Sequence, residues 1–163
     1  MAVDLEQIIP PLVRARVDFI LIGGMAAILH GSARVTFDVD VVYSRTDQNI
    51  ERLAAALAPH GPHLRGAPRD LPFSWDARTS RNGLNFTLAT NLGDVDLFGE
   101  VGGGETYSDL LPHSLEVEAF RVRFKCIDLP TLIRIKEAAD RPKDREAVAE
   151  LRVLLEESEE RQG

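Results

Sequence analysis

The sequence predicts a fold of the α/β (α+β) class: a mixed β-sheet flanked by helices, with a helical C-terminal segment. Two kinds of pattern support this prediction. Several short segments are continuously apolar or alternate between apolar and polar residues, as strands do. Other segments, at both ends of the chain and around residue 50, carry apolar residues at the spacing of amphipathic helices.

The N-terminal part is expected to alternate between helices and strands. Apolar residues at helical spacing predict a helix over residues 5–13. The apolar run at residues 19–22 predicts a buried strand that turns sharply at the glycine pair after it. A helix is then expected over residues 25–30. Residues 35–43 alternate in polarity and predict a second strand, with Phe37 and the valines after it on its apolar face.

The middle of the chain predicts one helix and two hairpins. Thr46 or Asp47 can cap a helix that ends near Pro59 and Gly61. Paired segments predict the hairpins, at 84–89 with 95–98 and at 115–118 with 120–126. The stretch between the helix and the first hairpin, residues 60–82, is rich in Gly, Pro and Arg and is expected to form an exposed loop or strand edge.

The C-terminal segment reads as helical. A helix is expected to start at Asp128, with Pro130 in its first turn. Pro142 should interrupt it, because proline lacks the backbone donor that a helix interior requires. The helix should then resume from Lys143 to about Glu157.

Length and composition limit the function classes. The 163 residues predict one domain, residues 1–163, with an α/β core over 1–127 and C-terminal helices over 128–160. The net charge of −7 argues against a broad basic surface for nucleic acid. The apolar runs are too short to span a membrane, so no membrane is expected. The single Cys126 excludes an internal disulfide, and an acidic N-terminus without signal-peptide character points to the cytoplasm.

Two carboxylates alternate with a valine in Asp38-Val39-Asp40. Residues two apart in a strand point the same way, with Cα atoms about 6.5 Å apart. At that distance two negative charges repel by about 3 kcal/mol at an effective dielectric of 20. A partly buried pair therefore favours a cation, and oxygen ligands suit Mg²⁺ or Mn²⁺. The alternative is the solvated polar face of an edge strand.

A glycine pair, Gly23-Gly24, follows the first apolar strand and precedes a helix. Its backbone N–H groups and the helix N-terminus would suit a phosphate. The alternative is a tight turn that needs the conformational freedom of glycine. Thirteen residues separate Gly24 from Asp38.

Together, Ile22-Gly23-Gly24 and Asp38-Val39-Asp40 resemble the signature of the polymerase-β-like nucleotidyltransferase superfamily. The segment between them, with Arg34 and Thr36, is similar to the branch of small AbiEii-type toxins and minimal nucleotidyltransferases. The match is specific over residues 19–43 and looser beyond. The resemblance implies a nucleotidyltransferase fold, a nucleoside triphosphate substrate and a divalent metal.

The resemblance also implies a third carboxylate on a later strand. Asp96, in Val95-Asp96-Leu97, fits the pattern, and Asp94 is its rival on the same strand face. Asp38, Asp40 and Asp96 would then form the catalytic, metal-binding set, with Asp96 as general base or second-metal ligand. By the same resemblance Lys136 would face the triphosphate and Asp144 would support the site.

Four further residues keep two interpretations each. Arg34 and Thr36 could contact phosphate or orient Asp38, and Arg34 could also pair with a surface acid. Ser32 could bind phosphate or cap a helix end. Trp75 could stack a nucleobase or pack against the body of the protein. It lies among four arginines: Arg65, Arg69, Arg78 and Arg81.

The predicted function is transfer of a nucleoside monophosphate to a hydroxyl of RNA, a protein or a small molecule, with a toxin–antitoxin role among the options. The alternative is a non-catalytic antitoxin or regulatory module that keeps the fold and docks to a toxin or antitoxin partner. Metal-dependent nucleotide binding that requires Asp38 and Asp40 would distinguish the two.

Overall fold

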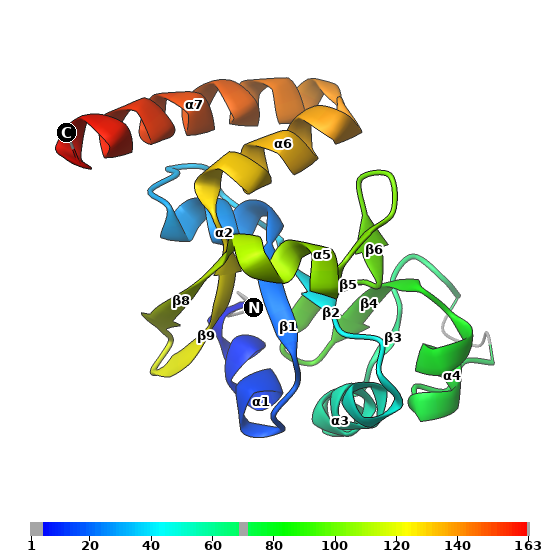
Figure 1. Cartoon of the computed structure of the whole chain (residues 1–163). Coiled ribbons are helices and arrows are strands. Elements are labelled where there is room, and N and C mark those ends of the chain that lie inside the picture. The colour runs from blue at the N-terminus through cyan, green and yellow to red at the C-terminus, as the bar shows by residue number, and fades with distance from the viewer. Residues whose placement is uncertain (1–4, 69–71, 163) are drawn as a thin grey trace.

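The computed structural model of the protein describes residues 5–68 and 72–162 (Figure 1). Its strands are β1 (Phe19–Ile22), β2 (Asp38–Tyr43), β3 (His63–Leu64), β4 (Asn85–Thr90), β5 (Gly93–Phe98), β6 (Glu100–Val101), β7 (Glu105–Thr106), β8 (Ser114–Ala119) and β9 (Val122–Ile127). Its α-helices are α1 (Ile9–Arg14), α2 (Gly23–Leu29), α3 (Asp47–Leu57), α4 (Ala77–Asn82), α5 (Tyr107–Leu110), α6 (Leu129–Ala139) and α7 (Pro142–Gln162). Short 3-10 turns are η1 (Leu5–Gln7), η2 (Ala58–His60) and η3 (Leu111–His113).

Seven strands form one mixed sheet in the order β3-β4-β5-β2-β1-β9-β8. The pairs β2–β5 and β1–β9 are parallel, and the other neighbours are antiparallel. β6 and β7 form a separate small hairpin. The predicted mixed sheet flanked by helices is therefore confirmed, and both expected hairpins, β4–β5 and β8–β9, are present.

Helices cover the sheet on both sides (Figure 1). α6 and α7 lie across the top of the view with α2 beneath them, while α1 and α3 lie at the bottom. All four residues of β1 are buried, as a central strand with cover on both faces requires. None of the helices among the described residues combines the length and the apolar character that crossing a bilayer would take.

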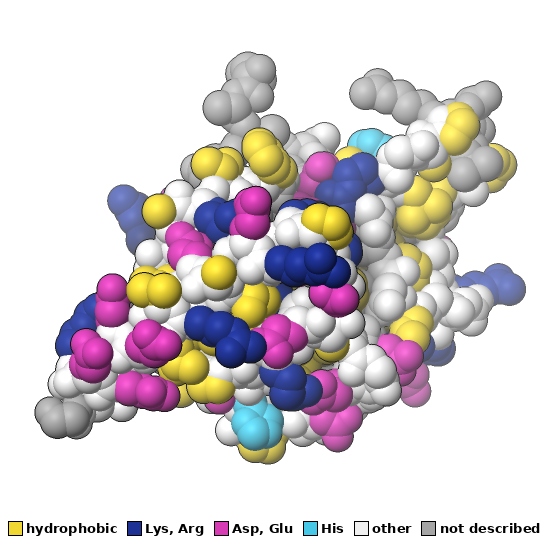
Figure 2. Space-filling model, turned by 90° about the horizontal axis from the view of Figure 1, so that it is seen from above, with side chains coloured by type: hydrophobic (Ala, Val, Ile, Leu, Met, Phe, Trp, Pro, Cys, Tyr) yellow, Lys and Arg dark blue, Asp and Glu magenta, His cyan; other side chains and the backbone are white. Residues whose placement is uncertain are grey.

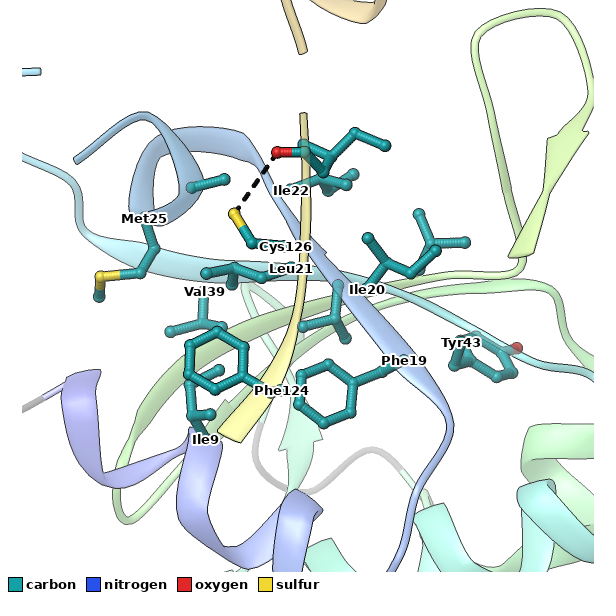
Figure 3. Packing of buried hydrophobic residues seen from close by; sticks show 14 of the residues in the cluster. Ile9, Phe19, Ile20, Leu21, Ile22, Met25, Val39, Tyr43, Phe124 and Cys126 are labelled. Carbon is teal, nitrogen blue, oxygen red and sulfur yellow. Dashed lines mark hydrogen bonds between the residues drawn. The ribbon is translucent and has the colours of Figure 1, made fainter. Parts of the chain in front are cut away.

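The core holds the central strands β1, β2 and β9 in place (Figure 3). The rings of Phe19 and Phe124 stack with centroids 6.2 Å apart, and Val39 and Met25 are buried near them. The buried thiol of Cys126 lies 3.6 Å from the carbonyl of Ile127, so this cysteine is a core residue. Each such apolar side chain stabilises the fold by about 1.5–3 kcal/mol when fully buried, which fixes the strands that carry the polar residues.

The predicted helix starts are capped by side chains. The hydroxyl of Thr46 accepts a hydrogen bond from the backbone N–H of Asn49 at 3.3 Å, and Asp128 accepts one from Thr131 at 2.9 Å. α6 ends where Asp140 adopts a left-handed conformation with φ of +45°. α7 then begins at Pro142, one residue before the expected start at Lys143, and runs further than the expected end near Glu157.

Other boundaries also differ from the sequence prediction. β2 begins at Asp38, so Phe37 is outside the strand, and it is 81% exposed instead of lying on the apolar face. α2 begins at Gly23 and includes the glycine pair, whereas a start at Met25 was expected. The stretch 60–82 contains the short strand β3 and the helix α4 besides its loops. Arg69 lies outside the described residues.

Candidate active site

Four aspartates face one another across the parallel pair β2 and β5. Asp38 lies opposite Asp94, and Asp40 lies opposite Asp96. Alternate residues of a strand share a face, and directly opposed residues on neighbouring strands share it too. The valines between the aspartates, Val39 and Val95, are fully buried on the other face. The alternating pattern of both strands therefore gathers the carboxylates on one side of the sheet.

Asp38, Asp40 and Asp96 can place one carboxylate oxygen each within 4.8 Å of one another. Asp94 does not belong to this set of three. Oδ1 of Asp40 is buried and has no hydrogen-bond partner among the described residues. A buried carboxylate oxygen without a donor is costly unless a cation or a proton satisfies it. Three oxygen ligands around such an atom fit a hard divalent cation such as Mg²⁺ or Mn²⁺.

The surroundings disfavour the charged forms of Asp38 and Asp40. Burial raises the pKa of Asp40 to about 8, and the nearby charges of Asp38 and Asp96 add to the increase. The pKa of Asp38 is also raised, first by burial and then by Asp96, with Arg65 and Lys143 opposing. If these acids are ionised, the protein neighbours do not fully stabilise their charge, and a bound cation would do so.

The glycine pair makes room for the carboxylate strand. Gly23 has a φ of +69°, and a Cβ there would lie 2.8 Å from Cβ of Asp40. A Cβ on Gly24 would lie 2.6 Å from Oγ1 of Thr36. Contacts under 3.0 Å force a shift, so a larger residue at Gly23 would displace the Asp40 side chain, and one at Gly24 would displace the Thr36 side chain. Thr36 in turn donates from its hydroxyl to the carbonyl of Asp38 at 3.1 Å.

Basic side chains of α6 and α7 approach the carboxylates. Lys136 on α6 interacts electrostatically with Asp40, and Lys143 on α7 interacts with Asp38. Burial lowers the pKa of Lys136, while Asp144 and Asp40 act in the opposite direction. A partly buried ammonium group beside a carboxylate cluster can bind a phosphate oxygen with little competition from water.

No protein-family model and no curated protein matches the sequence, whereas solved structures do match the fold. The lincosamide antibiotic adenylyltransferase LnuA, with lincomycin bound, aligns with a TM-score of 0.60 at 14% identity, over 91% of this chain and 94% of LnuA. The protein TM1012 of Thermotoga maritima, assigned as a nucleotidyltransferase, aligns with a TM-score of 0.53 at 17% identity, over 94% of this chain and 91% of that one.

The chain has the nucleotidyltransferase fold. At these identities the likeness establishes the fold alone. The resemblance to the AbiEii-type branch therefore stays a prediction, as do the individual roles of the site residues.

Within this nucleotidyltransferase fold, Asp144 supports the turn between α6 and α7. Its side chain is buried and accepts two hydrogen bonds from the Arg141 guanidinium, at 2.7 and 3.2 Å, and one from the Arg141 backbone at 3.1 Å. Burial alone would raise the pKa of Asp144, but the bonds from Arg141 outweigh it and hold the pKa below its ordinary value of 3.8. Asp144 thus orients Arg141, and the two occupy the edge of the site.

Ser32 and Arg34 contact α7. The Ser32 hydroxyl donates to Oε1 of Glu150 at 2.6 Å, and the other carboxylate oxygen accepts from the backbone of Ala33 at 3.1 Å. Arg34 forms an exposed ion pair with Glu146 at 3.7 Å, as one of its sequence-based interpretations expected. A phosphate bound by either residue would have to replace these contacts.

Two hollows meet at the cluster. One, of about 390 Å³, lies between the 32–37 segment and α7 and includes Asp38, Lys136 and Lys143. The other, of about 460 Å³, lies between the β6–β7 hairpin and α6 and has mostly apolar walls, including Phe98, Val101 and Leu132. Asp40, Lys136, Phe98 and Arg141 line both. Both hollows therefore lie beside the Asp40 carboxylate, and the one along α7 is the more polar of the two.

The sequence interpretation missed Arg65 as a site residue. Its guanidinium contacts Asp38, Asp94 and Asp96, although the sequence places it 27 residues after Asp38 in a stretch expected to be exposed. No local pattern marks it, since only strand pairing brings it to the cluster. Trp75, which lies in the same arginine-rich stretch of the sequence as Arg65, packs edge-on against Phe86 with ring centroids 5.4 Å apart. Its indole therefore packs against the body of the protein.

Proposed function

We propose that this protein is a Mg²⁺-dependent nucleotidyltransferase that transfers a nucleoside monophosphate from a nucleoside triphosphate to a hydroxyl group. The observation that carries the proposal is the buried Oδ1 of Asp40, which has no hydrogen-bond partner in the described part of the chain and lies in a triangle of carboxylates. The nucleotidyltransferase fold of LnuA and TM1012 supports the same reaction class. Mn²⁺ could replace Mg²⁺, because both prefer oxygen ligands.

In this proposal Asp38, Asp40 and Asp96 hold the metal. A bound divalent cation would neutralise phosphate charge and lower the pKa of the attacking hydroxyl. The acceptor oxygen bonds to the α-phosphorus, and the α–β phosphoanhydride bond breaks. Pyrophosphate leaves with the bonding electrons, and the hydroxyl proton passes to the carboxylate of Asp96 as general base.

The remaining site residues position the nucleotide. Lys136 contributes a point charge to the phosphates, and Asp144 contributes indirectly by orienting Arg141. Gly23 and Gly24 allow a phosphate and β2 to approach the start of α2 closely. Thr36 orients Asp38 through its carbonyl. Ser32 and Arg34 line the polar hollow and would reach the phosphates after exchanging their α7 partners.

Three acceptor classes remain: RNA, a protein side chain and a small molecule. The near full-length match to LnuA, an enzyme that adenylylates an antibiotic, supports the small molecule, as does the apolar hollow beside Asp40. The face over α6 and α7 carries interspersed basic and acidic side chains, which does not favour an extended RNA (Figure 2). The same proposal holds that the protein is a single domain and works in the cytoplasm. It also includes a toxin or antitoxin as a possible partner.

Calorimetry tests the proposal directly. The wild type should bind a non-hydrolysable nucleoside triphosphate analogue in the presence of Mg²⁺ and should not bind it in EDTA. The double variant Asp38→Ala/Asp40→Ala, with its fold checked by circular dichroism, should lose this binding. No metal-dependent binding by the wild type, or undiminished binding by the variant, would contradict the proposal.

Labelling identifies the acceptor. The protein is incubated with cell extract and each of the four nucleoside triphosphates, labelled at the α-phosphate. A labelled RNA band, a labelled protein band or a labelled small compound separates the three classes. The Asp38→Ala/Asp40→Ala variant serves as the control, because transfer that survives in it comes from other enzymes of the extract.

One contact favours the non-catalytic alternative. An arginine that bridges the carboxylates, as Arg65 does, could make the cluster a structural ion network in a docking module. In that case a stoichiometric partner should co-purify with the wild type and with Asp38→Ala alike, and neither should transfer a nucleotide. If the wild type transfers a nucleotide and Asp38→Ala does not, this alternative is rejected.

A further inference from the structure

Arg65 is a positive charge placed among the carboxylates of the site. Its Nη1 lies 3.2 Å from Oδ2 of Asp94 and 3.8 Å from Oδ2 of Asp38. Its Nη2 donates a hydrogen bond to Oδ1 of Asp96. Two of these three partners, Asp38 and Asp96, belong to the set that can surround a metal, and the third does not.

Strand pairing explains how Arg65 reaches the cluster. It follows β3, and its backbone N–H donates to the carbonyl of Thr87 on β4 at 3.0 Å. Thr87 lies opposite Asp96, and the next residue on that face of β4, Ala89, lies opposite Asp94. Both β4 residues are small, so the long arginine side chain can extend across β4 to the carboxylates of β5 and β2.

A guanidinium and a metal ion cannot both use the same carboxylate oxygens at full strength. Arg65 contacts the outer carboxylates of Asp38 and Asp96, while the deeper Asp40 keeps an oxygen to which none of the described residues donates a hydrogen bond. The single positive charge of Arg65 is shared among the three aspartates that it contacts. The arrangement therefore has the features of a metal-free state in which the protein supplies part of the missing positive charge.

We infer that Arg65 is an internal counter-ion that holds the carboxylate cluster together without metal, releases Asp38 and Asp96 when metal binds, and stays anchored on Asp94. The inference rests on the proposed function, because it assumes that the cluster binds a divalent cation. In this inference Asp94, which is not part of the proposed metal-binding set, anchors the Arg65 guanidinium. Arg65 and Asp94 are then positioning residues, and the apparent metal affinity includes the work of displacing the guanidinium.

Mn²⁺ binding, measured by calorimetry without nucleotide, tests the exchange. In Arg65→Gln the competing charge is gone, so Mn²⁺ should bind at least about tenfold more tightly than to the wild type. The same variant should unfold at a lower temperature in EDTA, and added Mn²⁺ should raise its melting temperature more than that of the wild type. Arg81→Gln is the matched control, since Arg81 pairs with Asp47 away from the cluster and its loss should leave Mn²⁺ affinity unchanged.

Arg65→Lys provides a second, milder variant in case Arg65→Gln does not fold. Lysine keeps the charge but lacks the fork that spans two carboxylates, so Mn²⁺ should bind it more tightly than the wild type and less tightly than Arg65→Gln. Unchanged or weaker Mn²⁺ binding in folded variants would overturn the counter-ion role while leaving the metal site intact. Failure of the wild type and both variants to bind Mn²⁺ would overturn the metal site itself.

Discussion

The backbone of Gly23 lies directly against the side chain of Asp40, so closely that a Cβ on Gly23 would lie 2.8 Å from Cβ of Asp40. The two residues are 17 positions apart in the chain, and the antiparallel pairing of β1 with β2 brings Ile22 opposite Asp40. The glycine turn is therefore one wall of the carboxylate cluster. The left-handed backbone of Gly23 therefore helps to fix the position of the Asp40 carboxyl group.

Gly23→Ala should destabilise the protein and disturb the site. The substitution combines the strain of a φ of +69° with a clash against Asp40, and we expect it to lower the free energy of unfolding by about 2–3 kcal/mol. Urea denaturation measures the loss. Gly103→Ala is the control: φ there is +83°, and no atom of residues 5–68 or 72–162 lies within 4 Å of the added Cβ, so it should cost only about 1 kcal/mol. Equal losses in the two variants would contradict the close contact with Asp40.

Asp40→Asn should separate stability from metal binding. The amide replaces a buried carboxyl group whose pKa burial raises to about 8 and whose Oδ1 has no hydrogen-bond partner among the described residues. The free energy of unfolding in EDTA should therefore stay within about 1 kcal/mol of the wild type or rise. Loss of a residue that only supports a metal ligand lowers metal affinity by about 10–100-fold. Because Asp40 would be a ligand itself, Mn²⁺ affinity should fall by more than that. Chemical denaturation and calorimetry give the two values. A variant that binds Mn²⁺ like the wild type would remove Asp40 from the metal site.

Lys136→Met should weaken nucleotide binding without unfolding the protein. Methionine keeps the apolar length of the side chain and removes a charge that burial already disfavours. Loss of one hydrogen bond between charged groups predicts about 10–100-fold weaker binding of a nucleoside triphosphate analogue by calorimetry. Lys125→Ala, on the exposed side of β9, should leave this affinity unchanged. A similar loss in both variants would indicate a general effect of net charge.

Asp144→Asn should lower stability at neutral pH and lose its effect in acid. The pKa of Asp144 is held below 3.8 in the folded protein, so its ionised form contributes stability that is fully present above pH 3.8. We expect a loss of about 1–2 kcal/mol at pH 7, because the partner Arg141 is largely exposed and water weakens the pair.

The pH dependence of that loss is the decisive measurement. As the pH falls below 3.8 and through the lower folded pKa, the wild type loses the contribution of Asp144, and its unfolding free energy should converge on that of the variant. Glu118→Gln is the control, since both partners of the Glu118–Arg123 pair are more than 70% exposed and the change should stay within about 0.5 kcal/mol. A difference that grows on acidification would contradict the ionised role of Asp144.

Much of the fold could be predicted because its signals are local. Strand β1, the helix starts near Thr46 and at Asp128 and both hairpins follow from short patterns that depend on hydrogen bonding and on the periodicity of side chains. The prediction for Phe37 was wrong for the opposite reason. Its alternation continues that of β2, but the ladder begins only at Asp38, where β5 provides partners.

The sequence by itself determined the chemistry available to the site: a glycine pair at a strand end and aspartates in alternation on two strands, since strand geometry places alternate side chains on one face. Only the tertiary structure decided which of these groups meet. Parallel pairing of β2 with β5 placed Asp96 beside Asp38 and Asp40, and placed Asp94 opposite Asp38. Pairing of β3 with β4 brought the Arg65 side chain into contact with Asp38, Asp94 and Asp96. Register and strand order depend on contacts between residues far apart in the chain, and no local pattern encodes them.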